Sequence, residues 1–148
     1  MAATRPSTRR ARSRRLRRTA WPTAFLLAIP VLAVLAGIRL SRFVVAGPSM
    51  APTLLDGDRL LVLRGPPRLL RPRAGQLVVA RPRALDGREV VKRVDTIAGH
   101  CRAAVYHLRG DNLPRSTDSR HFGPVARTEI TGLALLRYWP DARRGRIG

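Results

Sequence analysis

The chain contains a single lysine, Lys92, inside the apolar run Glu89–Val94, which reads EVVKRV. All its other basic residues, among 29 lysines and arginines, are arginine. A buried lysine can lose its proton near neutral pH, whereas a guanidinium cannot, and the neutral amine can act as a base or nucleophile. The valines beside Lys92 supply the apolar surroundings that this shift needs. A lone lysine is also consistent with an accident of composition, so other residues must decide between the two interpretations.

Two polar, glycine-containing stretches flank the lysine. Gly47–Asp58 reads GPSMAPTLLDGD and precedes it, and Gly110–Arg120 reads GDNLPRSTDSR and follows it. Both contain serines, and a serine hydroxyl becomes an effective nucleophile only when a neighbouring base takes its proton.

In these three segments the sequence resembles the signal peptidase I family of membrane-bound serine proteases. The nucleophile motif of that family, S-M-x-P-T-L-x-x-G-D, matches Ser49–Asp58 at every specified position. Its late motif, G-D-N-x-x-x-S-x-D-S-R, matches Gly110–Arg120 throughout, and its K-R-V strand corresponds to Lys92–Val94. The ending R-Y-W-P, here Arg137–Pro140, extends the resemblance over nearly the whole chain.

The resemblance implies a Ser–Lys dyad with Ser49 as nucleophile and Lys92 as general base. Ser116 would hydrogen-bond and orient the amine, and Asp118 and Arg120 would form an ion pair that holds the late loop. Buried lysines titrate below their usual pKa of about 10.4, which a base working near neutral pH requires. The resemblance implies neither a metal nor another cofactor.

The oxyanion and substrate sites are also expected near the first motif. Some family members place a serine two residues before the nucleophile, but this chain has Gly47 there, so main-chain N–H groups, chiefly that of Ser49, would hold the oxyanion. We expect Phe43, Val44 and Val45 to form an extended edge to which the substrate adds as a strand. Their apolar side chains would shape shallow pockets for alanine-like residues.

The elements that must position these residues are strands. Apolar runs broken by glycine and proline predict strands at residues 59–64, 76–80, 89–94, 103–108 and 130–138. No helix-period segment of useful length follows Ile38. The pattern predicts a mostly β fold: a compact antiparallel β-domain over residues 41–148, preceded by one N-terminal transmembrane helix.

The expected transmembrane helix rests on Ala20–Ile38, which contains no charged residue and is long enough to cross a bilayer. We expect an anchor at residues 19–40 and an arginine-rich tail at 1–18. Positive charge favours the cytoplasmic side, so the tail would lie in the cytoplasm and the catalytic domain outside. A cleaved signal peptide and an organelle presequence are the alternatives. The apolar run is longer than in most cleaved signals, which favours an anchor.

The formal net charge of +20 is compatible with binding nucleic acid or an anionic membrane. The arginine-rich tail contains no aromatic residue that could stack on bases, so we expect no nucleic-acid partner. The expected partners are preprotein signal peptides and the lipid bilayer. The resemblance places the chain in a bacterial plasma membrane as a single-pass protein.

Histidine chemistry is the alternative to a lysine base. His100, His107 and His121 could pair with Ser49 and an aspartate, but nothing around them resembles a catalytic triad. Cys101, the single cysteine, excludes an intrachain disulfide. Its spacing from His100 and His107 matches no common zinc pattern, so no metal site is expected.

Several positions depart from the family pattern. Ala98-Gly99-His100 stands where a P-G-D turn is usual, and Gly75-Gln76 replaces a G-D pair. The short interval between Lys92 and Gly110 leaves no room for the additional β-domain of larger members. These departures remove no catalytic group, but they leave open which substrates the chain accepts.

Three functions follow from these observations. The first is a serine endopeptidase that removes N-terminal signal peptides from exported preproteins at small-x-small sites. The second is a dedicated maturation protease for one precursor, comparable to the proteases of nickel-type superoxide dismutase or of the mitochondrial inner membrane. The third is a non-catalytic, membrane-anchored binding module, which the two complete motifs disfavour.

Overall fold

The computed structural model describes residues 31–32, 34–99 and 103–147. The expected tail at 1–18, most of the expected anchor at 19–40, and the residues His100 and Cys101 lie outside this part of the chain. Within the described ranges, no helix has the length and apolar character needed to cross a membrane.

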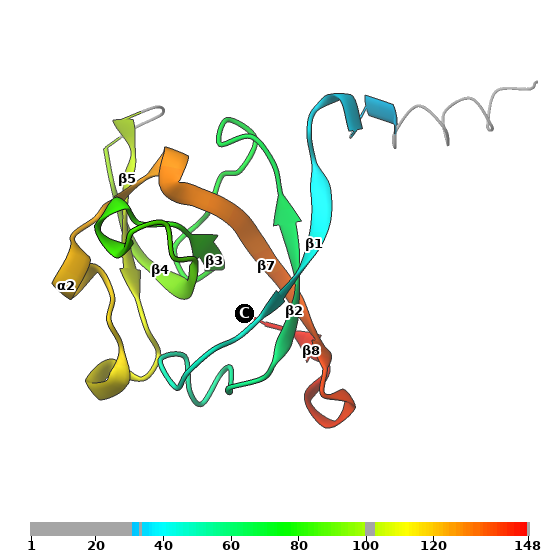
Figure 1. Cartoon of the computed structure of the whole chain (residues 1–148). Helices are drawn as coiled ribbons and strands as arrows, with labels where there is room; N and C mark the ends of the chain where they lie inside the picture. The colour runs from blue at the N-terminus through cyan, green and yellow to red at the C-terminus, as the bar shows by residue number, and fades with distance from the viewer. Residues whose placement is uncertain (1–30, 33, 100–102, 148) are drawn as a thin grey trace, which may run out of the picture.

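The described residues form one antiparallel sheet of eight strands that curves into a half-barrel (Figure 1). The strand order is β1-β2-β7-β3-β4-β5-β6, and β8 pairs with β7. The strands are β1 (Arg39–Val44), β2 (Arg59–Arg64), β3 (Leu77–Ala80), β4 (Val90–Ala98), β5 (Val105–Arg109), β6 (Val125–Ala126), β7 (Ile130–Trp139) and β8 (Gly145–Arg146). Among the described residues from Arg39 onward, the only α-helix is α2 (Ser119–Phe122), which is one turn long. Short 3₁₀ turns span Arg83–Leu85, Leu113–Arg115, Arg127–Glu129 and Asp141–Arg143.

The prediction of a mostly antiparallel β-domain is confirmed, and each of the five predicted strands is present. The strand predicted at 89–94 begins at Val90 and continues to Ala98. Strand β1 begins at Arg39, so the last two residues of the range expected for the anchor belong to the sheet. The two-residue strands β6 and β8 are too short to leave a pattern in the sequence.

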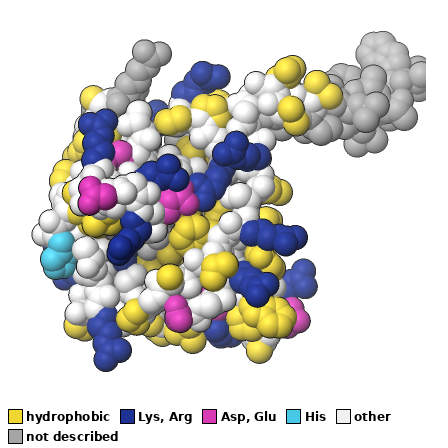
Figure 2. All heavy atoms as spheres, in the orientation of Figure 1, with side chains coloured by type: hydrophobic (Ala, Val, Ile, Leu, Met, Phe, Trp, Pro, Cys, Tyr) yellow, Lys and Arg dark blue, Asp and Glu magenta, His cyan; other side chains and the backbone are white. Residues whose placement is uncertain are grey.

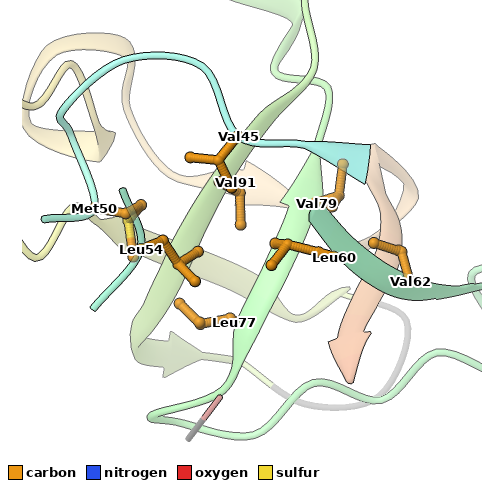
Figure 3. Close-up of a cluster of buried hydrophobic side chains, with 8 residues drawn as sticks. All are labelled: Val45, Met50, Leu54, Leu60, Val62, Leu77, Val79 and Val91. Carbon is orange, nitrogen blue, oxygen red and sulfur yellow. The ribbon is translucent and has the colours of Figure 1, made fainter. Parts of the chain in front are cut away.

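Two clusters of buried apolar side chains hold the half-barrel together. The first cluster, shown in Figure 3, consists of Val45, Met50, Leu54, Leu60, Val62, Leu77, Val79 and Val91. The second contains Val78, Ala80, Val94, Ala104, Tyr106, Leu108, Val125 and Ile130. Strand β3 contributes alternate residues to both clusters, because successive side chains point to opposite faces of a strand. This explains why β3 is apolar throughout.

A buried carboxylate fixes the start of β2. Asp58 is 0% exposed and forms ion pairs with Arg137 at 3.2 Å and Arg143 at 2.7 Å. Arg137 also donates to the carbonyl of Thr53 at 2.8 Å. The segment that contains Ser49 is therefore attached to the C-terminal end of the sheet by charge-assisted hydrogen bonds.

Candidate active site

Ser49 lies in the tight turn between β1 and β2. The Ala51 N–H donates to the Pro48 carbonyl at 3.1 Å, and the Leu54 N–H donates to the Met50 carbonyl at 2.9 Å. Met50 and Leu54 are both 0% exposed and belong to the first apolar cluster (Figure 3). Ser49 itself is half-buried. The apolar residues of the motif thus hold the turn in the core while the serine stays accessible.

Lys92 projects from β4 and is only 3% exposed. Its Nζ donates a hydrogen bond to Ser116 Oγ at 3.2 Å. Burial lowers the pKa of the Lys92 amine, and the nearby carboxylates of Asp118 and Asp111 oppose that shift without cancelling it. The lysine therefore has the burial, the partner and the direction of pKa change that a base requires.

Gly110 is the point at which the two motifs meet. A Cβ at this position would stand 2.0 Å from Ser116 Oγ and 2.6 Å from the carbonyl oxygen of Ser49. Real Cβ atoms do not approach other atoms so closely, so only glycine fits. The Ser116 hydroxyl, which holds Lys92, and the Ser49 carbonyl therefore both lie next to Gly110.

The two residues after Gly110 attach the late motif to the serine turn. The Asn112 N–H donates to the Ser49 carbonyl at 3.0 Å, and Asn112 Nδ2 donates to the Pro48 carbonyl at 3.0 Å. Asp111 accepts two hydrogen bonds from Arg93, at 2.9 and 2.7 Å, and one from the Thr53 side chain. Our reading of the sequence assigned no role to Asp111 or Asn112, although their place in the late motif was a signal.

The ion pair expected between Asp118 and Arg120 is present, with Arg120 Nε 2.8 Å from Asp118 Oδ1. Asp118 is fully buried and also accepts a hydrogen bond from the Gly110 N–H at 3.1 Å. Burial raises the pKa of this carboxyl, but hydrogen bonds from Arg120, Gly110 and Ser116 outweigh it and hold the pKa far below its usual range. Asp118 is therefore ionised and accepts a hydrogen bond from Ser116, the residue that holds Lys92.

Lys92 and Ser49 share no hydrogen bond in this structure. Among the described residues, Lys92 is hydrogen-bonded to Ser116, and the main chain of Ser49 is hydrogen-bonded to Asn112. Catalytic hydrogen bonds are often long without substrate and shorten when it binds. Lys92, through Ser116, and the main chain of Ser49 are thus both held beside Gly110, but they are not hydrogen-bonded to each other.

Gly47 and Ser49, the two residues expected at the oxyanion site, differ in whether their main-chain N–H has a partner among the described residues. Gly47 has a φ of +82°, which favours glycine, and its N–H donates to Asp56 Oδ1 at 2.7 Å. The N–H of Ser49 donates to no group within the described ranges. Only Ser49 therefore keeps its main-chain donor available for an oxyanion, because the Asp56 carboxylate occupies that of Gly47.

Strand β1 lies at one edge of the sheet, as expected for Phe43 and Val44, and pairs only with β2. Val44 is 58% exposed, and Phe43 packs against the first apolar cluster. Val45 differs from the expectation: it is 2% exposed, and its N–H and carbonyl are bonded to Asp58 and Gly57. Its side chain fills the core and presents no free surface to a substrate.

Strand β4 offers a second open edge next to the lysine. It pairs with β3 over Val90–Arg93, whereas its pairing with β5 starts only at Arg93. Over Val90–Lys92, the edge of β4 that faces away from β3 has no strand partner among the described elements. An extended chain could hydrogen-bond there beside the amine.

The two described histidines, His107 and His121, form no hydrogen bond with Lys92. His107 lies in β5 and pairs with Thr96 of β4. His121 Nδ1 accepts a hydrogen bond from the Asp118 N–H at 3.4 Å. Neither forms a hydrogen bond with Ser49. The alternative of a histidine base gains no support from these two residues.

Comparisons with known proteins agree with the motifs. A family model described as signal peptidase, peptidase S26, matches residues 18–101 and 100–139. The chain is 39% identical over 122 residues to the mitochondrial ATP-independent inner membrane protease subunit 1a of Arabidopsis thaliana, covering 70% of this chain and 73% of that protein. It is 29% identical over 167 residues to the probable signal peptidase I-1 of Synechocystis sp., covering 81% of this chain and 85% of that protein.

A third relative is the mitochondrial inner membrane protease subunit 1 of Xenopus tropicalis. It is 33% identical over 111 residues, which cover 64% of this chain and 66% of that protein. The family model spans the β-domain from before β1 to the end of β7, and so includes both motifs and the lysine strand. The chain is a serine peptidase and belongs to the peptidase S26 signal peptidase family.

Proposed function

We propose that the chain is a membrane-anchored endopeptidase that removes N-terminal signal peptides from exported preproteins, with Ser49 as nucleophile and Lys92 as general base. The observation that carries the proposal is the buried amine of Lys92, whose pKa is lowered and whose Nζ is held by Ser116 at 3.2 Å. Two of the relatives described above are named as inner membrane proteases and one as a probable signal peptidase.

In the proposed reaction, the neutral Lys92 amine takes the proton of Ser49 Oγ as this oxygen attacks the scissile carbonyl. The Ser49 N–H, which has no partner among the described groups, donates to the developing oxyanion. The Lys92 ammonium then gives its proton to the leaving amine, and an acyl ester remains on Ser49. The same amine next deprotonates a water molecule that attacks the ester. The acyl group is released as the Lys92 ammonium returns the proton to Ser49 Oγ.

Ser116 acts here as a positioning residue. Its hydroxyl lies between Lys92 and Asp118, so it accepts a hydrogen bond from the amine and donates one to the carboxylate. This leaves the nitrogen lone pair of Lys92 to be aimed at Ser49. Substrate binding then brings Ser49 Oγ into hydrogen-bonding distance of Nζ.

We place the extended substrate between the open edges of β1 and β4. Phe43 and Val44 lie on the first edge, and Val90–Lys92 forms the second. A shallow site bounded by such edges suits small side chains, which fits cleavage at small-x-small sequences. The segment 31–38 leads directly into β1, so an anchor at 19–40 would hold this site close to a bilayer.

A dedicated precursor is the second candidate for the substrate. It is favoured by the higher identity to the Arabidopsis inner membrane protease subunit than to the probable signal peptidase, 39% against 29%. A panel of preproteins with small-x-small sites separates the two. A general signal peptidase cleaves most of the panel, whereas a dedicated enzyme cleaves one precursor only.

The test of the catalytic assignment uses Ser49→Ala and Lys92→Arg in the full chain, with cleavage of a small-x-small preprotein as the readout. We expect each variant to lose at least about 10³-fold in kcat/KM, with an unchanged circular dichroism spectrum. The matched control is Thr117→Ala, an exposed hydroxyl in the late loop, which should retain wild-type activity. Substantial activity in either catalytic variant would refute the dyad.

A further inference from the structure

A second concave site lies away from the two motifs. It is an open cavity of about 790 Å³ bounded by the loop between β2 and β3, the end of β4, the start of β5 and the turn at Arg127–Glu129. Neither Ser49 nor Lys92 lines it. The peptidase reaction as proposed makes no use of this cavity.

Among the described residues, the lining of the cavity is basic and contains no carboxylate. Arg68 and Arg71 are exposed and form no ion pair with any described carboxylate. Arg127 donates to the carbonyls of Pro67, Leu70 and Arg68 at 2.7–3.2 Å, so its guanidinium fixes the loop that carries the other two arginines. Planar guanidinium groups bind phosphate oxygens with paired hydrogen bonds, and two of them side by side favour a phosphate ligand.

Besides the arginines, the described lining contains apolar residues, together with Tyr106 and Thr128. Ile97 is 40% exposed, and Pro67 and Pro72 form part of the wall from the same loop as the arginines. On that loop, Leu69 is also 45% exposed. A site that combines arginines with apolar residues matches an amphipathic ligand that contains a phosphate.

The cavity lies at the end of the domain from which the N-terminal segment leaves. A Cβ on Gly37 would stand 3.6 Å from Pro66, and one on Gly65 would stand 3.5 Å from the Ile38 side chain. The loop that carries the arginines therefore packs against the chain just before β1. Figure 1 shows the start of β1, this loop and the start of β5 at the same end of the domain.

The chemistry of that end fits a membrane surface. Four apolar residues before Gly37 are 57–78% exposed: Val31, Leu32, Val34 and Leu35. In Figure 2, dark blue basic side chains and yellow apolar side chains are mixed at this end of the molecule. Apolar residues beside arginines are typical of surfaces that contact anionic lipids.

We propose that the cavity binds the headgroup phosphate of an anionic phospholipid. Arg68 and Arg71 bind the phosphate oxygens, and Ile97 and the prolines contact the glycerol and the first acyl carbons. The bound lipid fixes the tilt of the half-barrel over the bilayer. The inference rests on the proposed membrane attachment and is independent of the Ser–Lys chemistry.

The test is a titration of the purified full chain, in an uncharged detergent, with dihexanoyl phosphatidylglycerol, dihexanoyl phosphatidylcholine or inorganic phosphate. The readout is the ¹³C-methyl NMR signal of Ile97. We expect a saturable shift with phosphatidylglycerol and binding at least about tenfold weaker for the other two probes. Equal binding of inorganic phosphate would overturn the lipid assignment and leave a free-anion site, and an absence of saturable shift would overturn the site itself.

Variants separate the pocket from general surface charge. Arg68→Gln with Arg71→Gln should weaken phosphatidylglycerol binding about tenfold or more, whereas Arg68→Lys with Arg71→Lys should retain part of it. Arg83→Gln with Arg88→Gln removes the same charge from exposed arginines outside the cavity and should change the affinity less than about twofold. Equal losses in both glutamine pairs would contradict a built site.

The catalytic and lipid proposals fail separately in this design. Ser49→Ala should bind phosphatidylglycerol with wild-type affinity while it loses cleavage. If Ser49→Ala remains active but the lipid shift persists, the dyad is wrong and the lipid site stands. If cleavage is lost as expected but no variant of the cavity alters lipid binding, the lipid site is wrong and the dyad stands.

Discussion

The ammonium form of Lys92 is disfavoured in the folded protein because the side chain is only 3% exposed. Its strand, β4, also contains the buried valines Val91 and Val94. Two carboxylates, Asp118 and Asp111, attract the ammonium charge, yet burial dominates and the pKa of Lys92 is lowered. Ser116 separates the amine from Asp118, which prevents a direct ion pair that would hold the proton on nitrogen. The pKa of Lys92 is thus set by burial, which lowers it, and by two nearby carboxylates, which raise it.

This balance predicts how stability depends on pH. A lysine with a lowered folded-state pKa binds fewer protons when folded than when unfolded, so the free energy of unfolding rises with pH between the folded value and the ordinary value of about 10.4. Below the folded pKa the full penalty of the buried charge remains. We expect Lys92→Met to be more stable than the wild type at low pH, by an amount that shrinks as pH rises.

Chemical denaturation of the wild type and Lys92→Met at a series of pH values measures this difference. Arg88→Met, at an exposed position without an ion pair, is the control and should show no such trend. A gap that widens as pH rises would mean that the lysine gains rather than loses protons on folding.

At the scale of elements, the late loop serves as the template for the serine turn. Asn112 binds the carbonyls of Pro48 and Ser49, and Gly110 makes room for the Ser49 carbonyl and the Ser116 hydroxyl together. The lysine strand joins the same assembly through Arg93 and Asp111. Three segments that are distant in sequence thus become one site through hydrogen bonds and one ion pair.

Gly110→Ala tests this junction. Its Cβ would overlap Ser116 Oγ and the Ser49 carbonyl, so we expect destabilisation of about 1–3 kcal/mol and a fall in kcat of at least about tenfold. Thermal unfolding and preprotein cleavage measure the two effects. In the control Gly65→Ala, the new Cβ meets its neighbours at ordinary contact distances and should leave kcat unchanged. Wild-type kcat and stability in Gly110→Ala would refute the junction.

The strands could be predicted from the sequence because apolar runs between glycines and prolines mark them, and β2 matches its predicted range of 59–64. Ser49, Lys92 and the Asp118–Arg120 pair could be chosen because whole motifs carry them. The burial of Val45 could not, because an apolar residue next to an edge strand suits the core and the surface equally. The hydrogen bond from Gly47 to Asp56 depends on the shape of a turn, which spacing alone does not encode.

At the scale of the whole molecule, charge and apolar surface are distributed unevenly. The apolar segment before β1 and the arginine-lined cavity lie at the same end of the half-barrel, and the serine turn follows β1 directly. The turn between β1 and β2, which contains the serine, lies at the opposite end of these two strands (Figure 1).

The proposed anchor at 19–40 predicts the behaviour of the full chain in cells. It should stay in the membrane pellet after alkaline carbonate extraction, because a spanning apolar helix resists extraction. A protease added outside intact bacterial cells or spheroplasts should digest the β-domain, with a cytoplasmic marker as the protected control. Release by carbonate would contradict the anchor, and protection of the β-domain would contradict the orientation.

The most direct measurement of the central claim uses the fact that the chain has one lysine. Protein labelled with [¹³Cε]lysine gives a single lysine Cε signal, and its chemical shift against pH reports the pKa of Lys92 itself. We predict a titration midpoint clearly below the ordinary lysine value of about 10.4. A wild-type midpoint at or above about 10.4 would show that Lys92 remains an ammonium and cannot be the base.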